Sequence, residues 1–339
     1  MGAGSLTIQQ VLRETAKAVD PIMLGYLSKG VGRSFRPIVT HQVKAGGKRV
    51  RPALTLLCCQ ACGGRLTDAI LPAAVFELIH NYSLIMDDII DHGELRRGRP
   101  TVRAEYGDTQ ALLAGMFYRE VIGEMAASLP ISREVYALVV NAIKQTIEGE
   151  RMDILFEQAG RGEDYIARHR YRWVTPGLYF KVIMKKTAEL IKAACLAGAV
   201  AAQAGKSQFK AISTYGEKVG LAFQVVDDFL DIFGKETGKQ RGKDILEHKL
   251  NNAVIVYALP EMNSQERSRL MKIVRTEKVD AARLRQAITL LESTGAKSKV
   301  QRLAKRLVED AKRSLEALPE TPARESLAEL ADFIAARLY

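Results

Sequence analysis

A long repeat of residues at helical spacing is the feature that most restricts the folds open to this chain. It is clearest in segment 68–91, where residues recur at three- and four-residue steps. The recurring residues are Ala73, Phe76, Glu77, His80, Leu84, Asp87 and Asp91. The 339 residues include only 10 prolines and 6% aromatics, and no strand-turn-strand series with Asn-Gly or Asp-Gly turns is visible. We therefore expect an all-α protein.

Similar patterns predict helices along most of the remaining chain. The expected helices cover residues 5–30, 46–65 (after a short loop), 108–128, 132–158, 163–176, 185–203, 207–233, 245–261, 264–275, 279–293, 296–317 and 322–338. The Gly- and Lys-rich segment 234–244 indicates a basic loop. Because no low-complexity linker divides the chain, we expect a single domain over residues 1–339. Residues 264–339 would be a helical C-terminal part of it.

The charge balance favours anionic partners. The chain carries 50 Lys and Arg against 39 Asp and Glu, a formal net charge of +11, which suits nucleic acid, acidic membranes or polyphosphates. Zinc-finger spacings and basic-aromatic stripes are lacking, so we expect no nucleic-acid partner.

The compartment is predicted from features that the sequence lacks. The N-terminal segment has no apolar block of the signal-peptide kind, and no window holds 18 uninterrupted apolar residues. We therefore expect a cytoplasmic protein without a transmembrane segment. The four cysteines lie in apolar stretches and are expected to be buried, reduced thiols. A Cys58–Cys62 metal pair is the alternative, but no nearby His or Cys pair completes it.

An acidic motif, D-D-x-x-D, occurs twice in apolar helical sequence. Its carboxylates are Asp87, Asp88 and Asp91 in the first copy and Asp227, Asp228 and Asp231 in the second. Positions four apart share one helix face, so like charges gather there and a cation should lie between them. Magnesium suits such oxygen ligands and completes its shell with phosphate oxygens. A single copy would more often be a solvated acidic face, but two copies are harder to explain in that way.

Basic residues flank both acidic motifs. They are Lys48, Arg49, Arg51, Arg96, Arg97, Lys186, Lys239 and Lys249. Each one alone would be read as a surface charge. Acidic pairs that hold magnesium and are ringed by Lys and Arg would bind a diphosphate and stabilise it as a leaving group.

Taken together, these motifs resemble the polyprenyl synthetase family, and within it the archaeal-type short-chain farnesyl and geranylgeranyl diphosphate synthases. The matching motifs, in order, are G-G-K-R-V-R-P, D-D-I-I-D followed by L-R-R-G-R-P-T-V, K-T-A, F-Q-V-V-D-D-F-L-D and a G-K…G-K-D loop. The resemblance covers roughly residues 40–260. It implies a trans-isoprenyl diphosphate synthase built as an antiparallel helical bundle around a deep central cavity. A homodimer with three Mg²⁺ ions per site, when diphosphate is bound, is also implied.

The resemblance also implies roles for individual residues. The metal ligands would be Asp87, Asp91 and Asp227. Supporting or water-mediated metal contacts would come from Asp88, Asp228 and Asp231. The allylic diphosphate would be held by Arg96, Lys186, Thr187, Gln224, Lys239 and Lys249. Of these, the residues closest to catalysis would be Lys186, Thr187, Gln224 and Lys239. Isopentenyl diphosphate would be bound by Lys48, Arg51, His80 and Arg97.

The implied reaction agrees with this residue chemistry. Loss of diphosphate gives an allylic carbocation, the double bond of isopentenyl diphosphate attacks it, and a proton is then lost. No protein nucleophile is required, and none of the Ser/His/Asp or Cys/His type is apparent. Four positions depart from the family's frequent residues and leave substrate preference open. They are Met86, Arg103, Met116 and Glu150.

Product length is the last expectation. In the family, residues four and five places before the first motif influence it, and here these are Ser83 and the bulky Tyr82. We expect geranylgeranyl diphosphate, with farnesyl or longer diphosphates as alternatives. Two other classes remain open, a terpene cyclase and a non-catalytic regulatory subunit. The intact second motif, together with Lys48 and Arg51, argues against the cyclase.

Overall fold

The computed structural model describes residues 7–234 and 241–338. About 76% of the chain is helical, and the only sheet in these ranges is a two-stranded hairpin, which confirms the all-α class. The elements of the first half are α1 (Ile8–Ser28), α2 (Arg36–Lys44), α3 (Val50–Ala61), α4 (Leu66–Ile90), β1 (Leu95–Arg96), β2 (Arg99–Pro100), α5 (Val102–Tyr106), α6 (Asp108–Ala127), α7 (Ser132–Ile154) and α8 (Asp164–His169). The remaining elements are α9 (Pro176–Ile183), η1 (Met184–Ala188), α10 (Glu189–Ala201), α11 (Lys206–Phe233), α12 (Lys243–Leu246), α13 (Ala253–Ala258), α14 (Ser264–Val274), α15 (Ala281–Glu292), α16 (Ala296–Ser314), η2 (Leu315–Ala317), α17 (Pro322–Ala335) and η3 (Ala336–Leu338).

The chain divides into two compact units. Unit 1 takes its residues from 1–143, 190–216 and 314–330. Unit 2 takes its residues from 144–189, 217–313 and 331–339. The single domain expected from the sequence stays a prediction.

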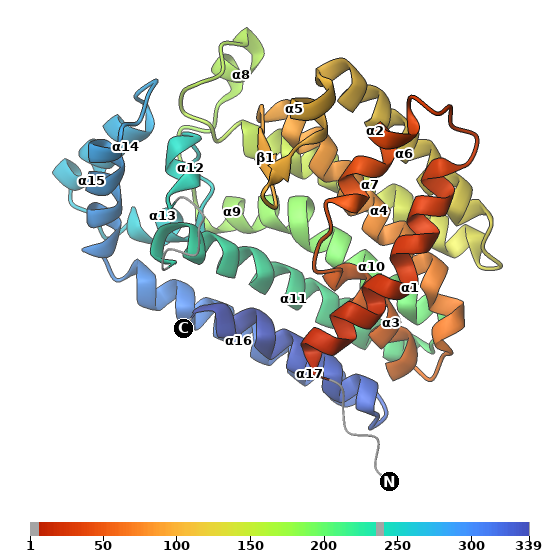
Figure 1. Ribbon diagram of the computed structural model, residues 1–339. Helices are drawn as coiled ribbons and strands as arrows, with labels where there is room; N and C mark the ends of the chain where they lie inside the picture. Colours follow the sequence, from red (N-terminus) through yellow and green to blue (C-terminus); the bar gives the residue numbers. More distant parts are fainter. Residues whose placement is uncertain (1–6, 235–240, 339) are drawn as a thin grey trace. The chain divides into compact units, whose positions relative to one another are not determined.

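Helix α4 forms the centre of unit 1. It packs against α1, α3 and α6 (Figure 1), and Phe76 and Ile79 lie in the core with at most 1% exposure. Apolar residues surround α4 on all sides, as is typical of a core helix. It is also the one described helix long and apolar enough to cross a membrane, but 67% of the relevant window is buried inside the protein. This burial is what a core helix of a folded domain shows.

Unit 2 contains a π-helical turn, η1, between α9 and α10. Helix α7 approaches this turn closely at Gly149, because a Cβ at that position would lie only 2.3 Å from the backbone nitrogen of Lys186. Single π-turns of this kind occur often at functional sites. Elsewhere in unit 2, α14 and α15 lie side by side (Figure 1).

Two segments differ from the expected helices. The helix predicted over 163–176 is reduced to the short α8, and the chain is then irregular until Thr175. Pro176 contributes to this break, because a proline disfavours helical geometry in the residue before it. The helix predicted over 245–261 is split into α12 and α13, with Asn252 as the N-cap of α13. Helices α2 and α5 lie outside the predicted ranges.

Candidate active site

The first acidic motif lies at the C-terminal end of α4. Asp87 and Asp88 are in its last turn, and Asp91 caps the helix with an N–H that donates to the Asp87 carbonyl at 2.8 Å. The helix stops because His92 is left-handed (φ 52°) and the N–H of Gly93 donates to the Asp88 carbonyl at 2.9 Å. This ending places the half-buried Asp87 and Asp91 one turn apart. Carboxylates at a helix C-terminus oppose the helix dipole, so the arrangement favours a bound cation.

A hairpin after α4 brings a guanidinium back to the first motif. Arg96 of β1 pairs with Arg99 of β2, and the two turn residues, Arg97 and Gly98, have φ values of 57° and 75°. Two positive φ values are typical of the tight turns that suit a twisted hairpin. Arg96 donates to both oxygens of Asp88, with Nη2–Oδ1 at 2.7 Å and Nε–Oδ2 at 3.0 Å. Asp88 is only 3% exposed, so this carboxylate positions Arg96.

Arg49 is the buried centre of the loop before α3. Its side chain has 0% exposure, and its φ of 53° is left-handed. All five of its N–H donors are matched by acceptors, which are Asp20 Oδ1 (2.7 Å) and Oδ2 (3.1 Å), Glu77 Oε1 (3.1 Å), the Gly46 carbonyl (2.9 Å) and the Val43 carbonyl (3.0 Å). Burial raises the pKa of Glu77, and the charge of Arg49 opposes that rise. Arg49 therefore fixes the loop conformation.

The other basic residues of unit 1 include a group around His80. Lys48 is exposed in the same loop, and Arg51 is half-buried in the first turn of α3. Burial, followed by the positive charges of Arg51 and Arg97, lowers the pKa of His80 well below its usual range. These guanidiniums therefore lie near His80, which is neutral at pH 7 and can both donate and accept a hydrogen bond.

The residues just before the first motif are half-buried in α4. Tyr82 packs against the hydrophobic core of unit 1, and Ser83 Oγ donates to the His80 carbonyl at 2.9 Å. Met86 lies against α6, since a Cβ at Gly115 would come within 2.8 Å of its sulfur atom. The departure at Met86 thus has a packing reason, because its side chain fills the close approach of α4 and α6.

Two further departures also have local explanations in unit 1. Arg103 donates from Nη1 to Glu94 at 2.8 Å and from Nε to Asp108 at 2.6 Å. It ties the hairpin to the start of α6. Met116 is 61% exposed on α6, and this exposed methionine adds to the apolar surface of that helix.

The second acidic motif is centred on Asp228, which holds a hydrogen-bond network in unit 2. One of its oxygens accepts from Gln224 Nε2 at 2.8 Å, and the other accepts from Tyr179 Oη at 2.7 Å and from the first N–H of α13 at 2.9 Å. Gln224 in turn accepts from Thr187 Oγ1 at 2.7 Å. Burial and the nearby charge of Asp244 raise the pKa of Asp228 well above its usual range. The network fixes Thr187 and Gln224 relative to this motif.

Two lysines share a group of carboxylates in unit 2. Lys186 Nζ lies 2.7 Å from both Glu150 Oε2 and Asp153 Oδ2. Lys249 Nζ lies 3.0 Å from Glu247 Oε2 and 3.8 Å from Asp153 Oδ2. Although burial opposes it, the charges of Lys186 and Lys249 lower the pKa of Asp153 to about 2. The shared carboxylates keep two largely buried cations close together and orient them.

The other carboxylates of the second motif have separate partners. Asp231 accepts from the backbone N–H groups of Lys243 at 2.8 Å and Asp244 at 3.3 Å. Burial and the charge of Asp244 raise the pKa of Asp231 to about 7. Asp227 Oδ1 forms an ion pair with Arg337 Nη1 at 2.8 Å. Burial and the nearby carboxylate both disfavour the ionised form of Asp231, and a bound cation would offset them.

The residues of these two clusters coincide with the part of the chain that is related to known proteins. A family model described as Polyprenyl synthetase matches residues 33–291, a span that contains both acidic motifs and most of both clusters of basic residues. The chain belongs to the polyprenyl synthetase family.

Members of the family match this chain over nearly its whole length. A short chain isoprenyl diphosphate synthase of Methanothermobacter thermautotrophicus is 35% identical over 98% of this chain and 99% of its own. The geranylgeranyl pyrophosphate synthetase of Pyrococcus horikoshii has a TM-score of 0.87 at 32% identity and covers 97% of this chain and 98% of its own. A decaprenyl diphosphate synthase of Rhodobacter capsulatus has a TM-score of 0.86 at 29% identity, covering 98% of both chains. The likeness confirms the isoprenoid synthase fold, and the relatives support a prenyl diphosphate synthase of undetermined product length.

The structure groups the predicted residues by unit. In unit 1, Asp88 holds Arg96, and His80 lies near Arg51 and Arg97. Its other predicted residues are Lys48, Tyr82, Ser83, Asp87 and Asp91. In unit 2, one network joins Thr187, Gln224 and Asp228, and another joins Lys186 and Lys249 through Asp153. Lys239 lies outside the described residues.

Several contributors were not indicated by the sequence patterns. They are Asp153, Tyr179, Asn251 and Arg337. Arg49, Glu77 and Asp244 lie within recognised sequence patterns, but no role in the site was predicted for them. Asp153 accepts from Asn251 Nδ2 at 2.9 Å in addition to its lysine partners. An acidic residue inside the helical sequence R-M-D-I-L is the one signal that could have drawn attention to it. Among the described residues, no group of three Asp, Glu, His or Cys side chains forms a complete metal site.

Proposed function

We propose that this protein is a magnesium-dependent trans-prenyltransferase that joins isopentenyl diphosphate to an allylic diphosphate and makes geranylgeranyl diphosphate. The main observation behind this proposal is that each acidic motif is hydrogen-bonded, directly or through one residue, to polar or basic side chains that can bind a diphosphate. In unit 1 the motif orients Arg96, and in unit 2 it is linked through Gln224 to the turn that bears Lys186 and Thr187. Family membership and the related synthases support the reaction class.

Magnesium fits the carboxylates of this chain. The proposed ligands are Asp87, Asp91 and Asp227, with Asp231 as a supporting or water-mediated contact. Because they are offered in pairs, phosphate oxygens and water would complete each coordination shell, as magnesium requires. We expect three ions when diphosphate is bound, and magnesium would then withdraw negative charge from the departing group. Asp88 and Asp228 would support the site, since their oxygens accept hydrogen bonds from Arg96 and Gln224.

The allylic diphosphate would be bound by a set of polar and basic groups. These are Arg96, Lys186, Thr187, Gln224, Lys239 and Lys249. Lys186 is already held at 2.7 Å by two carboxylates, so its ammonium group is oriented before the substrate arrives. Such pre-organisation lowers the cost of stabilising the leaving group.

Isopentenyl diphosphate would be bound by the basic group of unit 1. Its members are Lys48, Arg51, His80 and Arg97. Arg49 lies among them in sequence, but its five donors are all used inside the protein. His80, being neutral, would donate a single hydrogen bond to the diphosphate without adding charge.

The reaction proposed for these residues needs positioning and charge stabilisation. The C1–O bond of the allylic diphosphate breaks, and both electrons leave with the diphosphate. The double bond of isopentenyl diphosphate supplies the electrons for the new carbon–carbon bond. A proton then leaves C2 of the added unit and is taken up by the released diphosphate. The side chains bind and orient the two substrates, which is where most of such an acceleration arises.

Product length is proposed from the residues before the first motif, because related synthases make chains of different length. Tyr82 and Ser83 are the residues proposed to limit growth, and Tyr82 packs against the core of unit 1. A bulky side chain at this place supports a twenty-carbon product over a longer one. Farnesyl diphosphate or a longer product would be expected if other residues limited the growing prenyl chain.

We also propose a homodimer. Helix α6 has a row of exposed apolar side chains, with exposures of 46% for Leu112, 45% for Leu113 and 61% for Met116. An apolar surface of this kind on a charged protein is typical of an interface. Light scattering coupled to gel filtration should give twice the mass of one chain, and Leu113→Glu should reduce the measured mass to that of one chain.

Two other functions are weighed against the synthase. A terpene cyclase binds no second diphosphate substrate, so it would have no use for Lys48 and Arg51 as an isopentenyl diphosphate site. A non-catalytic subunit of a two-component synthase is the other candidate. One relative, 32% identical to this chain, is named component 2 of the heptaprenyl diphosphate synthase of Geobacillus stearothermophilus, so two-component enzymes occur among the relatives. Both acidic motifs are intact here, which favours a catalytic chain.

The deciding experiment is a set of incubations with labelled isopentenyl diphosphate and magnesium. Dimethylallyl, geranyl and farnesyl diphosphates would be offered in turn, and the products would be dephosphorylated and sized by chromatography. A twenty-carbon product, lost on chelation and in Asp87→Ala but kept in the exposed control Asp164→Ala, would support the proposal. Absence of elongation with every primer in a folded protein would refute it in favour of a cyclase or a subunit.

A further inference from the structure

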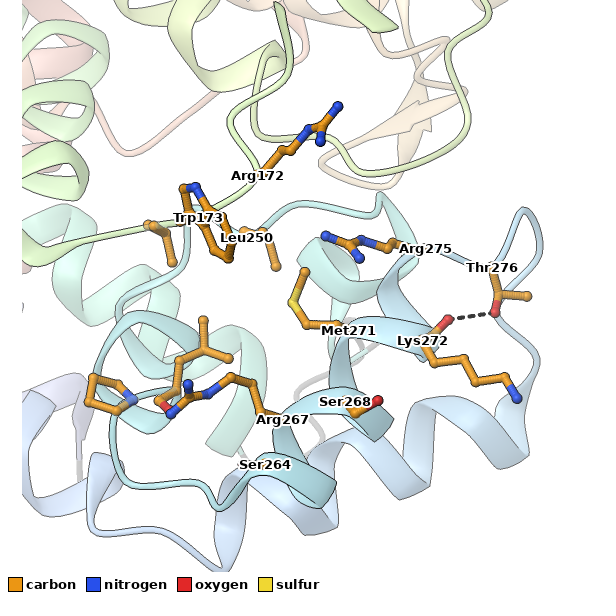
Figure 2. Close-up of a pocket in the computed structure, with 13 residues that line it drawn as sticks. Arg172, Trp173, Leu250, Ser264, Arg267, Ser268, Met271, Lys272, Arg275 and Thr276 are labelled. Atoms are coloured by element: carbon orange, nitrogen blue, oxygen red, sulfur yellow. Dashed lines mark hydrogen bonds between the residues drawn. The ribbon is translucent and has the colours of Figure 1, made fainter.

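A groove of about 920 Å³ lies in unit 2, and none of the predicted site residues lines it. It runs between the irregular segment before α9 and helix α14. Figure 2 shows the ring of Trp173 beside Leu250, with Met271 of α14 and Arg275, the residue that follows this helix, facing them. The lining thus combines an indole and aliphatic side chains with a guanidinium, a mixture suited to an amphipathic partner.

The aromatic rim of this groove is unusually exposed. Trp173 is the single tryptophan of the chain, and it is 79% exposed. Tyr165, which precedes Trp173 by eight residues in the chain and does not line the groove, is also 59% exposed. Tryptophan and tyrosine with one apolar face and one polar atom are enriched where proteins meet the surface of a membrane.

The groove is also strongly basic. Its cations are Arg172, Arg267, Lys272 and Arg275, and no Asp or Glu occurs among the described residues that line it. Arg267 is used within the fold, because it donates to the carbonyls of Leu259 and Met262 at 3.1 and 3.2 Å. The other three side chains form no ion pair with any residue in ranges 7–234 and 241–338. Unpaired cations around an exposed indole favour an anionic partner.

We propose that the groove and its rim bind the surface of an anionic phospholipid membrane. In this arrangement the indole of Trp173 would enter the interfacial layer, and Arg172 and Arg275 would contact phosphate head groups. A membrane suits the geometry better than one enclosed phosphate ester does, because Figure 2 shows the Arg172 guanidinium pointing away from Arg275. Cations that diverge can each meet a different head group. A peripheral contact of this kind needs no membrane-spanning segment.

The indole itself supplies a direct assay. Because Trp173 is the chain's single tryptophan, its emission reports on this groove alone. Vesicles with about one third phosphatidylglycerol, at low salt, should shift the emission of the full-length protein to shorter wavelength and carry the protein into the pellet. Pure phosphatidylcholine vesicles should do neither.

Charge-matched variants locate the contact. Each cation near a lipid surface contributes about fivefold to binding, so Arg172→Ala with Arg275→Ala should weaken co-sedimentation about 25-fold. The control double variant, Arg285→Ala with Arg302→Ala, removes the same charge from exposed positions outside the lining and should change binding by less than about threefold. Trp173→Ala should weaken binding, and Trp173→Phe should restore part of it.

Three results would overturn the proposal. The first is no pelleting with phosphatidylglycerol vesicles, and the second is equal weakening by the groove variant and the control. The third is a shift of the Trp173 emission by soluble geranyl diphosphate or inorganic diphosphate but not by vesicles, which would assign the groove to a free phosphate ester. Because all three measurements follow binding, they are independent of whether the protein elongates prenyl chains.

Discussion

Replacement of Arg49 by methionine tests whether the basic loop is held by a single buried side chain. Arg49→Met keeps most of the volume but removes five hydrogen-bond donors and the positive charge. Glu77, at 2% exposure, then loses the hydrogen bond from Arg49, whereas Asp20 at 32% exposure can turn to water. Removing one partner of a buried ion pair costs about 3–5 kcal/mol of unfolding free energy, and we expect this range.

The pH dependence provides a second reading of the same variant. Burial already raises the pKa of Glu77 in the folded protein, and Arg49 opposes that rise. Without Arg49 the folded-state pKa rises further, so the folded state binds more protons than the unfolded state as the pH falls. The variant should therefore regain stability as the pH falls from the folded-state pKa of Glu77 towards its ordinary value of 4.5. The gap to the wild type should narrow over that interval.

Urea unfolding followed by circular dichroism at two pH values would measure both effects. The matched controls are Glu77→Leu and the double variant that combines Arg49→Met with Glu77→Leu. Both controls lack the carboxylate that Arg49→Met alone leaves buried without its guanidinium partner. We expect the double variant to be more stable than Arg49→Met alone. A loss below about 1 kcal/mol, additive costs in the double variant, or a gap that does not change with pH would each refute the reasoning.

Three shorter predictions concern the acidic and chain-length residues. Lys186→Met should raise the pKa of Asp153 from about 2. The wild type loses unfolding free energy as the pH falls from about 4 to about 2, and the variant should show little of this loss because it lacks that stabilisation already at neutral pH. Acid titration followed by circular dichroism would show the difference. Arg337→Ala frees Asp227 from a half-exposed ion pair and should tighten magnesium binding in the presence of diphosphate about two- to fivefold by calorimetry; unchanged affinity would count against competition at this carboxylate. Tyr82→Ala should lengthen the product, and identical chromatograms would contradict its role.

The sequence was sufficient for the fold class and for the placement of both acidic motifs on helices. These two predictions were confirmed because helix periodicity and the four-residue spacing of carboxylates are local properties, whereas the metal role of the motifs stays a prediction. Arg49 is a contrasting case. It stands between Lys48 and Arg51 in one basic stretch, and its burial depends on a left-handed backbone and on Asp20, which lies 29 positions away. Such a contact depends on tertiary packing, which composition does not reveal.

The same limit explains the contacts that were missed around the second motif. Asp153 belongs to no motif, and one of its partners, Asn251, lies 98 positions away in the sequence. Tyr179 meets Asp228 over 49 positions. The predicted helix over 245–261 ignored the capping ability of Asn252, a local signal that was present in the sequence. The long-range polar contacts depend on the folded chain, whereas this cap can be read from neighbouring residues.

The π-helical turn η1 makes the site sensitive to the number of residues in this turn, and no substitution would reproduce the effect of changing that number. A π-turn holds one residue more than an α-turn, and here the extra residue lets Lys186 reach α7 while Thr187 reaches α11. Deleting one residue from 184–188 would restore a regular helix but rotate α9 by about 100° relative to α10. One of the two contacts would then be lost with little change in helix content. Relatives that bind diphosphate in this way should therefore tolerate exchanges in η1 far better than single-residue insertions or deletions.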